Sequence, residues 1–420
     1  MRTAKDSGFE WIGEIPISWK LYKGKYMFAQ RNLRGNNIEL QLLSPTQKFG
    51  VVPQSVYEEL SGMNAVKLNE NTNLSALKTI HKGDFCISLR SFQGGFEYSE
   101  YEGVVSPAYQ IFYPIINVSR GYYKYLFKEC GFIEKMNSYT MTLRDGKNIA
   151  FADFGNTYIP CPPVDEQRRI SDFLDIKCAE IDALTADIQT QIDTLEQYKR
   201  SVITETVTKG LNPDVDMKNS GIEWVGQMPL AWDAVPNKYL MYKVKNICPV
   251  YNGEDILSLT TNGVIIRDLN GGGKMPTSFD GYQKITPGNL LMCLFDIDVT
   301  PRCIGLVKNF GLTSPAYSQF VMRTGAYAPY YYYYYLMVDY TKELLHMAKN
   351  LRHSLTEDQL GAIKAPNPPY AEQVQIAEFL DKKCVEINRV IEDKNKQLAT
   401  LDEYKKSLIF EYVTGKKEVV

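Results

Sequence analysis

The sequence predicts an α+β protein in which two globular domains of mixed α/β structure are separated by two long, antiparallel, coiled-coil-like helices, with a pseudo-twofold internal repeat. Two observations predict this architecture. Residues 164–208 return as residues 370–414 at a constant offset of 206, with nearly half of the positions identical. Residues 7–20 return as residues 220–233 at an offset of 213. Both halves of the chain therefore begin alike and end alike.

The repeated segment at residues 164–208 has the apolar spacing of a long helix. Apolar side chains fall seven residues apart with a second apolar row between them, which is the heptad pattern of a coiled coil. A helix of this length runs about 65 Å at ~1.5 Å per residue. The first row is Leu174, Ile181, Ile188, Leu195 and Val202, and the second is Ile170, Leu184 and Tyr198.

The second copy carries the matching rows. Both copies also place a lysine and a glutamine on the second row, and polar residues at matched levels of a seam set its register at some cost in stability. We therefore expect the two helices to pair with each other in antiparallel orientation. The alternative is that each helix packs only on its own domain. The rows of the second copy are Leu380, Ile387, Lys394, Leu401 and Leu408, with Ile376, Val390 and Tyr404, and the polar residues are Lys177, Gln191, Lys383 and Gln397.

Length and composition indicate two or three globular domains. A chain of 420 residues exceeds one ordinary core, and a hydrophobic fraction of 44% is typical of globular proteins. No apolar run is long enough to cross a bilayer, and residues 1–13 lack the apolar centre of a signal peptide. We therefore expect a cytoplasmic protein with no membrane partner. The eight cysteines include no C-x-x-C pair, so buried free thiols are expected rather than zinc ligands or disulfides.

The charge distribution argues against one large basic surface. The net charge is −2, and residues 164–210 carry six lysines and arginines against ten aspartates and glutamates. Residues 1–163 and 211–369 are neutral or slightly basic. Any binding of DNA must therefore use local basic patches or the charge of a partner.

Each half opens with the pattern Glu-Trp-x-Gly-x-x-Pro-x-x-Trp, which predicts a loop whose two tryptophans pack on the following domain. We call this segment the tryptophan loop. Ligand binding is the alternative role, but large aromatic side chains more often stabilise a core. The four tryptophans are Trp11, Trp19, Trp224 and Trp232.

Between the tryptophan loop and the long helix of each half lie short β-prone runs broken by Gly, Pro and Asn. Tyrosine-rich stretches then follow at residues 121–127 and 330–335. Stacking on bases is one interpretation of these tyrosines, but an amphipathic helix closing the domain is favoured, since Leu336, Leu344 and Leu345 continue the apolar period. The predicted strands are residues 40–43, 85–89 and 110–113 in the first half and 256–259, 290–295 and 319–322 in the second.

Polar and basic side chains gather in short loops, and this composition suits contact with DNA. Arginine is the usual bidentate partner of guanine and asparagine that of adenine, whereas lysine mainly binds phosphate. Arg144 and Arg352 are the strongest candidates, because Leu-Arg recurs at one place in two otherwise diverged domains. The alternative for each residue is an ordinary solvated side chain. The predicted DNA-binding residues are Arg31, Asn32, Arg34, Asn36, Arg144, Lys147, Asn148, Lys243, Arg267, Lys274, Lys349, Arg352 and His353.

Several motif-like strings do not amount to catalytic or metal sites. Residues 367–370 spell Asn-Pro-Pro-Tyr, with which adenine-N6 methyltransferases hold a flipped base. The repeat aligns them with Cys-Pro-Pro-Val at residues 161–164, so the shared element is a proline helix start. No strand, glycine turn and helix for S-adenosylmethionine precede them. Residues 271–274 lack the spacing of a phosphate loop, and the three histidines are scattered, so no metal site is expected.

The combination of repeats resembles the DNA specificity (S) subunit of type I restriction-modification systems over almost the whole chain. The resemblance is carried by Pro-Pro-x-x-Glu-Gln helix starts at residues 162–167 and 368–373, each after a diverged domain, and by the duplicated tryptophan loops. Lys394 departs from the even pattern of the helices, because the first copy has Ile188 at this position.

The resemblance implies a target recognition domain 1 at residues 1–163, a first conserved spacer helix at 164–210, a target recognition domain 2 at 211–369 and a second conserved spacer helix at 370–420. It implies that each recognition domain reads one half of a split, asymmetric site in double-stranded DNA, with the helices as a ruler.

The resemblance also implies that this chain is not an enzyme and binds no cofactor. Two modification (methyltransferase) subunits would dock on the helices and bring S-adenosylmethionine for adenine-N6 methylation, and restriction/translocase subunits would use ATP and Mg. Two other functions stay open. One is a helical scaffold whose globular domains bind proteins, and the other is a stand-alone adenine methyltransferase.

Overall fold

The computed structural model describes residues 2–34, 40–63, 74–88, 95–139, 149–269, 276–348 and 353–419. Two compact units make up the chain. The first comprises Met1–Ile188 and Lys396–Val420, and the second comprises Gln189–Asn395. Each unit therefore contains part of both long helices. Within the described ranges, no helix is long and apolar enough to span a membrane.

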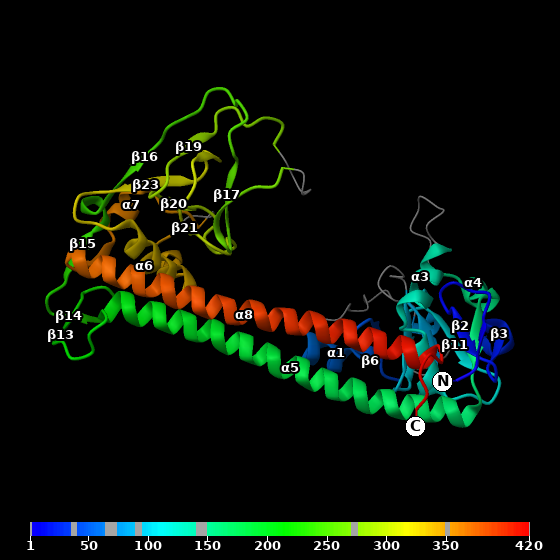
Figure 1. Ribbon diagram of the computed structural model, residues 1–420. Coiled ribbons are helices and arrows are strands. Elements are labelled where there is room, and N and C mark those ends of the chain that lie inside the picture. The colour runs from blue at the N-terminus through cyan, green and yellow to red at the C-terminus, as the bar shows by residue number, and fades with distance from the viewer. Residues whose placement is uncertain are drawn as a thin grey trace. The chain divides into compact units, whose positions relative to one another are not determined.

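In the first unit, short strands and helices precede the long helix α5 (Val164–Lys209) (Figure 1). The strands are β1 (Ala4–Asp6), β2 (Glu14–Pro16), β3 (Lys20–Lys23), β4 (Phe28–Arg31), β5 (Leu43–Thr46), β6 (Gly50–Pro53), β7 (Lys78–Ile80), β8 (Phe85–Ile87), β9 (Phe96–Tyr98), β10 (Gly103–Val105), β11 (Gln110–Pro114) and β12 (Tyr158–Cys161). The helices are η1 (Gly24–Tyr26), α1 (Gln54–Ser61), η2 (Leu74–Ala76), α2 (Arg120–Leu126), α3 (Cys130–Ser138) and α4 (Phe151–Asn156).

The second unit repeats this plan ahead of α8 (Tyr370–Val413). Its strands are β13 (Met217–Asn219), β14 (Gln227–Pro229), β15 (Asp233–Pro236), β16 (Met241–Val244), β17 (Leu257–Thr260), β18 (Gly263–Ile266), β19 (Gln283–Ile285), β20 (Leu290–Met292), β21 (Ile304–Leu306), β22 (Gly311–Thr313), β23 (Ser318–Met322) and β24 (Lys364–Asn367). Its helices are η4 (Asn237–Tyr239), α6 (Ala328–Tyr340), η5 (Glu343–Met347) and α7 (Glu357–Ala362).

The two units share one strand topology although their sequences have diverged. The four-stranded antiparallel sheet β4-β11-β8-β9 of the first unit has its counterpart in β16-β23-β20-β21 of the second. The pairs β1-β2, β3-β12, β5-β6 and β7-β10 likewise correspond to β13-β14, β15-β24, β17-β18 and β19-β22. The internal repeat therefore extends through the globular parts, where the sequence shows it only at the two ends.

Five of the six predicted strands coincide with observed ones, namely β8, β11, β17, β20 and β23. The prediction at residues 40–43 is wrong in position, because β5 starts only at Leu43. The turn sets this register. Gly50 has a φ of 71°, and the Thr46 hydroxyl accepts a hydrogen bond from the Phe49 N–H (3.0 Å) and donates one to the Gly50 carbonyl (3.0 Å). A hairpin closed there pairs residues 43–46 with residues 50–53.

The long helices pair with each other in antiparallel orientation within each unit. In the first unit the rings of Phe173 and Tyr412 lie 4.5 Å apart, and Lys405 Nζ donates to Asp182 Oδ1 at 2.6 Å. In the second unit Lys199 Nζ donates to Asn388 Oδ1 at 3.0 Å, and Lys394 donates to Gln191. As the residue number rises along α5, the number of its contact residue on α8 falls. The two helices are therefore antiparallel. Lys394, which interrupts the apolar pattern, therefore has a polar partner across the seam.

The buried stripe of each long helix keeps the predicted heptad spacing, but its second row lies one residue later than predicted. From Leu174 onward the steps alternate between four and three residues, which is the coiled-coil average of about 3.5 residues per turn. The first predicted row lies on the stripe, but the second leaves it, because Leu184 and Tyr198 are 53% and 49% exposed. On α5 the stripe is Ile170, Leu174, Cys178, Ile181, Thr185, Ile188, Ile192 and Leu195, and on α8 it lies 206 residues later.

The tyrosine-rich stretches form helices α2 and α6, as predicted, but α6 is not amphipathic. Tyr330, Tyr331, Tyr333, Tyr334 and Tyr335 are all at most 5% exposed, so these rings are buried around the whole helix and do not stack on bases. The predicted continuation is also wrong, because α6 ends before the two later leucines, which lie in η5.

Hydroxyl groups of these tyrosines fasten each unit to both long helices. Tyr122 donates to the carbonyl of Val413 at the end of α8 (2.6 Å), and Tyr125 donates to Asp175 on α5 (2.6 Å). Tyr330 and Tyr333 make the equivalent bonds, to the Val207 carbonyl at 3.0 Å and to Asp381 at 2.6 Å. Burial raises the pKa of all four phenols, so they stay protonated and act as donors.

The cysteines are free thiols, and five of the eight are buried. Cys130 is exposed, so the prediction of buried thiols is wrong for this residue. It occupies the first turn of α3, where the side chain of Glu129 accepts the free backbone N–H groups of Gly131 and Phe132 and fixes the helix start without help from the thiol.

Candidate nucleic-acid interface

The glutamate of each Pro-Pro-x-x-Glu-Gln motif binds the second tryptophan of the tryptophan loop. Trp19 and Trp232 are completely buried, and their indole N–H groups donate to Glu166 Oε2 at 3.1 Å and to Glu372 Oε2 at 2.9 Å. Arg2 also pairs with Glu166 at 2.5 Å. The predicted packing of these tryptophans is confirmed. Their function is to join the start of each globular part to the start of a long helix.

The glutamine of each motif binds the backbone around the helix start. Gln167 accepts from the Ser119 N–H at 2.8 Å and donates to the Pro162 carbonyl at 2.8 Å. Gln373 makes the same pair of bonds, accepting from the Tyr327 N–H at 2.7 Å and donating to the Pro368 carbonyl at 2.8 Å. Both motifs are thus structural joints, which leaves contact with DNA to other surfaces.

Asn-Pro-Pro-Tyr at residues 367–370 belongs to the second of these joints. Asn367 Oδ1 accepts hydrogen bonds from the Tyr331 hydroxyl at 2.8 Å and from Gln373 Nε2 at 3.2 Å. Asn367 also pairs with Asp233 at the end of β24. A methyltransferase needs this oxygen free to accept a bond from the target amino group, so the geometry opposes catalysis here.

Arg31 is the most constrained of the predicted DNA-binding residues. Its guanidinium makes two bonds to Asp84, Nε to Oδ2 at 2.7 Å and Nη2 to Oδ1 at 3.2 Å, and it lies 4.3 Å from the centre of the Tyr113 ring. Asp84 is 1% exposed and also accepts from the His81 N–H. A guanidinium fork already occupied by a buried carboxylate has little left to offer a guanine.

We expect Arg31→Ala to destabilise the first unit by about 3 kcal/mol, because the buried Asp84 carboxylate loses its charged partner. Hydrogen exchange of the full-length chain measures this as faster exchange in β4 and β8. Arg34→Ala, at an exposed position, is the control and should change stability by less than about 0.5 kcal/mol. An Arg31→Ala chain that keeps its stability but binds a different DNA sequence would restore Arg31 as a reading residue.

Asn32 and Arg34 are exposed and lie beyond the end of β4. Arg34 forms an isolated antiparallel bridge with Lys78, whose ammonium group donates to the Tyr109 carbonyl at 2.7 Å. Burial, and then the neighbouring charge of Arg34, lower the pKa of Lys78. This corner of the first unit therefore presents positive charge and an asparagine to solvent, as a DNA contact needs.

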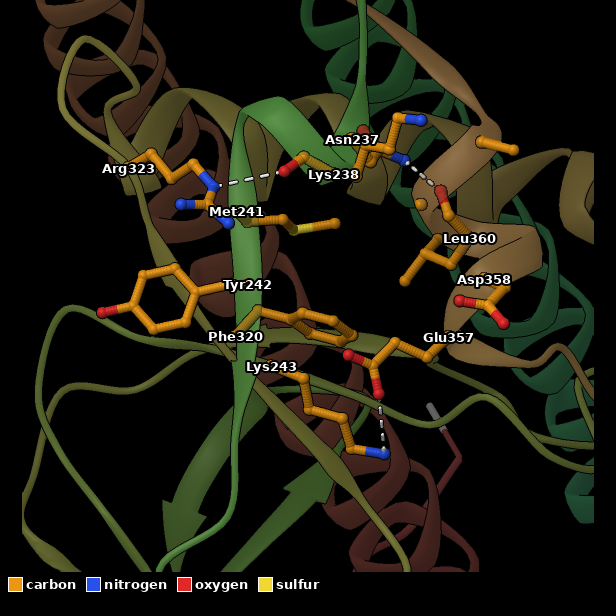
Figure 2. Close-up of a pocket in the computed structure, with 12 residues that line it drawn as sticks. Asn237, Lys238, Met241, Tyr242, Lys243, Phe320, Arg323, Glu357, Asp358 and Leu360 are labelled. Atoms are coloured by element: carbon orange, nitrogen blue, oxygen red, sulfur yellow. Dashed lines mark hydrogen bonds and ion pairs between the residues drawn. The ribbon is translucent and has the colours of Figure 1, made fainter.

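Lys243 lines a pocket of about 340 Å³ between β16 and α7 of the second unit (Figure 2). Met241, Phe320 and Leu360 form its apolar part. Lys243 Nζ lies 3.7 Å from Glu357, so the predicted residue is partly neutralised at the pocket rim. Three cations and two carboxylates line the pocket: Lys238, Lys243 and Arg323 with Glu357 and Asp358.

The other described candidates of the second unit are anchored in their own loops. Arg267 follows β18, is partly buried, and donates its backbone N–H to the Ile256 carbonyl at 2.7 Å. His353 precedes α7 and has a φ of 42°, and its Nε2 lies 3.9 Å from Asp298 Oδ2. The structure therefore places Lys243 on β16, and Arg267 and His353 in two separate loops. The predicted residues Asn36, Arg144, Lys147, Asn148, Lys274, Lys349 and Arg352 lie outside the described residues.

An exposed lysine–tyrosine sequence on each unit was missed by the sequence predictions. Lys25 and Tyr26 lie on η1, and Lys238 and Tyr239 lie on η4. The two tyrosines are 61% and 63% exposed. The sequence did contain a signal for these pairs. They lie 213 residues apart, which is the offset of the tryptophan loops.

The long helices carry a second candidate surface, made of the residues that leave the buried stripe. In the first unit Leu184 (53% exposed) and Tyr404 (54%) lie at the level of the Asp182–Lys405 bond. In the second unit Tyr198 (49%) and Val390 (45%) lie beside the Lys199–Asn388 bond. All four are displaced to the same side of their stripe by helical geometry, so within each antiparallel pair the two residues share one face. We call these two patches the helix-pair faces.

Residues 20–194 match a family model described as the type I restriction modification DNA specificity domain. The chain is 25% identical over 306 residues to the type I restriction enzyme MjaVIII specificity subunit of Methanocaldococcus jannaschii, a match covering 67% of this chain and 68% of the relative. It is also 25% identical over 282 residues to the putative MjaX specificity subunit of that organism, covering 62% and 59%.

Solved structures share the fold of this chain. A chain from a solved structure concerned with complex assembly and conformational transition of the type I R-M system superposes with a TM-score of 0.70 at 14% identity, covering 96% of this chain and 99% of that one. The family model, the curated relatives and the shared fold together support a type I restriction-modification specificity subunit. The crystal structure of the HsdS subunit from Thermoanaerobacter tengcongensis gives a TM-score of 0.51 at 13% identity, covering 98% and 100%.

These similarities agree with the resemblance carried by the duplicated helix starts and tryptophan loops. The two curated relatives are named as specificity subunits, and neither is named as a methylase or a nuclease. Among the residues that the structure describes, no three His, Cys, Asp or Glu side chains gather as metal ligands would.

Proposed function

We propose that this specificity subunit reads a bipartite, asymmetric site in double-stranded DNA, one half with each globular part. The proposal rests on the observation that the two units share one strand topology but expose different side chains. Both units have the same strand order, but beyond the ends of the matching strands β4 and β16 the first exposes Asn32 and Arg34, whereas the second exposes Lys245 and Ile247. A common scaffold with unlike polar surfaces suits two different half-sites.

The chain contributes recognition and no chemistry of its own in this proposal. The glutamates and glutamines of the repeated motifs are used as joints, and the Asn367 oxygen is already bonded. Modification subunits would supply S-adenosylmethionine and transfer its methyl group to adenine N6. Restriction subunits would supply ATP-driven translocation and cleavage with Mg. Half-sites held by the two parts should lie about one helical turn of DNA, or more, apart.

Two copies of one modification subunit would dock on the helix-pair faces. Each face offers an exposed tyrosine beside an exposed aliphatic residue, and tyrosine is enriched among residues that dominate binding energy at interfaces. The first unit supplies Tyr404 with Leu184, and the second supplies Tyr198 with Val390. A repeated face suits a repeated partner.

Mapping of modified adenines tests the proposed function. Cells expressing the chain with its modification and restriction subunits should carry methylated adenines in one split, asymmetric sequence. Exchange of residues 1–163 for the same region of another family member should change one half of that sequence and leave the other half and the spacer intact. A methylated sequence that survives the exchange unaltered would instead identify the globular parts as protein-binding modules. Methyl transfer by the isolated chain would identify it as an enzyme.

A further inference from the structure

We propose that the two lysine–tyrosine pairs, Lys25–Tyr26 and Lys238–Tyr239, bind the phosphate backbone of DNA, one pair at each half-site and independently of the base sequence. This inference rests on the proposed function, since it assumes that both units meet DNA. It adds the residues that hold the duplex without reading it.

The pairs occupy one place in the shared fold. η1 and η4 both follow the strand that pairs with the last strand before a long helix. Both are fixed by the same backbone bond, from the Gly24 N–H to the Thr157 carbonyl at 2.9 Å and from the Asn237 N–H to the Ile363 carbonyl at 2.8 Å. Equal anchoring in two diverged units means that the pair is presented from a rigid, repeated position.

The side chains of the pairs have no packing function in the fold. Packing falls to the next residues along the chain, Met27 in the first unit and Leu240 in the second, which are 0% and 4% exposed. Both lysines are exposed, and both tyrosines are more than half exposed. A repeated exposed aromatic residue costs solubility and gains nothing in the core, which points to a binding role.

Each lysine lies against the ring of its own tyrosine. Lys25 Nζ is 5.5 Å from the centre of the Tyr26 ring, and Lys238 Nζ is 5.1 Å from that of Tyr239. Lys25 Nζ also donates to Asn156 Oδ1 at 3.2 Å. These contacts restrain a flexible ammonium group while leaving donors free, so less side-chain entropy is lost when a phosphate binds.

Each pair has a further basic residue near it, Lys23 two residues before Lys25 and Arg323 bonded to the Lys238 carbonyl. In the first unit Lys23 Nζ lies 5.4 Å from the centre of the Tyr158 ring. In the second unit Arg323 lies 5.1 Å from the centre of the Tyr242 ring and donates from Nε to the Lys238 carbonyl at 3.2 Å (Figure 2). Glu357 and Asp358 offset part of this charge, but the three cations of that pocket outnumber them. Basic groups interleaved with aromatic rings fit a phosphodiester chain.

The two pairs have the same sequence, so they do not read different bases. Each pair also contains an exposed lysine, which favours phosphate over a protein partner. The same Lys-Tyr sequence cannot distinguish two unlike half-sites, whereas every half-site presents the same phosphates. Lysine is depleted from protein interfaces, because its strongly hydrated ammonium group is costly to bury there, but it is an ordinary ligand of phosphate.

Salt-dependent DNA binding tests the inference. The full-length chain assembled with its modification subunits is titrated onto a labelled duplex of arbitrary sequence between about 50 and 200 mM salt. The variant Lys25→Ala/Lys238→Ala should lower the slope of log K against log salt by about 2, or about 1 for each phosphate that is no longer bound. The control Lys82→Ala/Lys308→Ala removes one exposed lysine from each unit elsewhere and should leave the slope within about 0.5 of the unaltered protein.

Two further readouts separate the possible failures. The methylated sequence should be unchanged in Lys25→Ala/Lys238→Ala, with only the extent of methylation reduced. An unchanged salt slope would overturn the inference, and so would a variant that no longer assembles with modification subunits, since the pairs would then be a docking surface. If the unaltered assembly itself binds DNA without salt dependence, the proposed function fails as well.

Discussion

Tyr198→Asp combined with Tyr404→Asp should leave the chain folded and abolish its assembly with modification subunits. Both tyrosines are about half exposed, so the substitutions cost the isolated chain little. At an interface, loss of a central tyrosine costs about 2 kcal/mol or more, roughly thirtyfold in affinity, and a desolvated carboxylate costs more.

The number of modification subunits bound to the chain gives this prediction a quantitative readout. Each helix-pair face holds one of the two tyrosines, so Tyr404→Asp alone should leave one bound modification subunit and the double variant none, as measured by analytical ultracentrifugation. Ile176→Asp and Val385→Asp are matched controls. Both residues are exposed, at 60% and 68%, and lie on the far side of the same helices. If the double variant keeps two bound subunits, docking lies elsewhere.

Trp232→Ala should destabilise the second unit by about 4 kcal/mol. The side chain is completely buried in a core that includes Tyr330 and Ile376, and a Trp→Ala cavity costs about 3–5 kcal/mol. The substitution also removes the 2.9 Å hydrogen bond to Glu372 at the start of α8. We therefore expect the joint between the tryptophan loop and the helix to open.

Hydrogen exchange of the full-length chain checks this result, with faster exchange expected in β14, β15 and the first turns of α8. Trp232→Phe is the control, because it keeps an aromatic ring in the core and loses mainly the indole N–H bond, at about 1–2 kcal/mol. Equal protection in Trp232→Ala and the unaltered chain would mean that the repeated Trp–Glu contact is not what holds the joint.

The repeats made the broad architecture predictable, because identical residues at constant offsets require two copies of the same local structure. The helix period, the proline starts and the end of α5 at Gly210, whose φ is 78°, all follow from local chemistry. Five of the six predicted strands were found where β-prone runs stood alone, and the sixth was misplaced because a turn outside the run, at Thr46–Gly50, set the register.

The candidate site was less predictable, because exposure and pairing are decided by distant residues. Arg31 looks like a reading side chain until Asp84, 53 residues away, is seen to bind it. The tyrosine run looks like a stacking platform until the core closes around it. Conversely, Lys25–Tyr26 and Lys238–Tyr239 look unremarkable until both appear exposed at the same place in the fold.

The amino-acid sequence by itself determined that this protein is two copies of one unit, each ending in a long helix, and which family it resembles, since these depend on local spacing and identity. Only the tertiary structure decided which face of each helix is buried and which polar side chains are free. The physical reason is that a residue's availability depends on what packs against it, and those partners come from elsewhere in the chain.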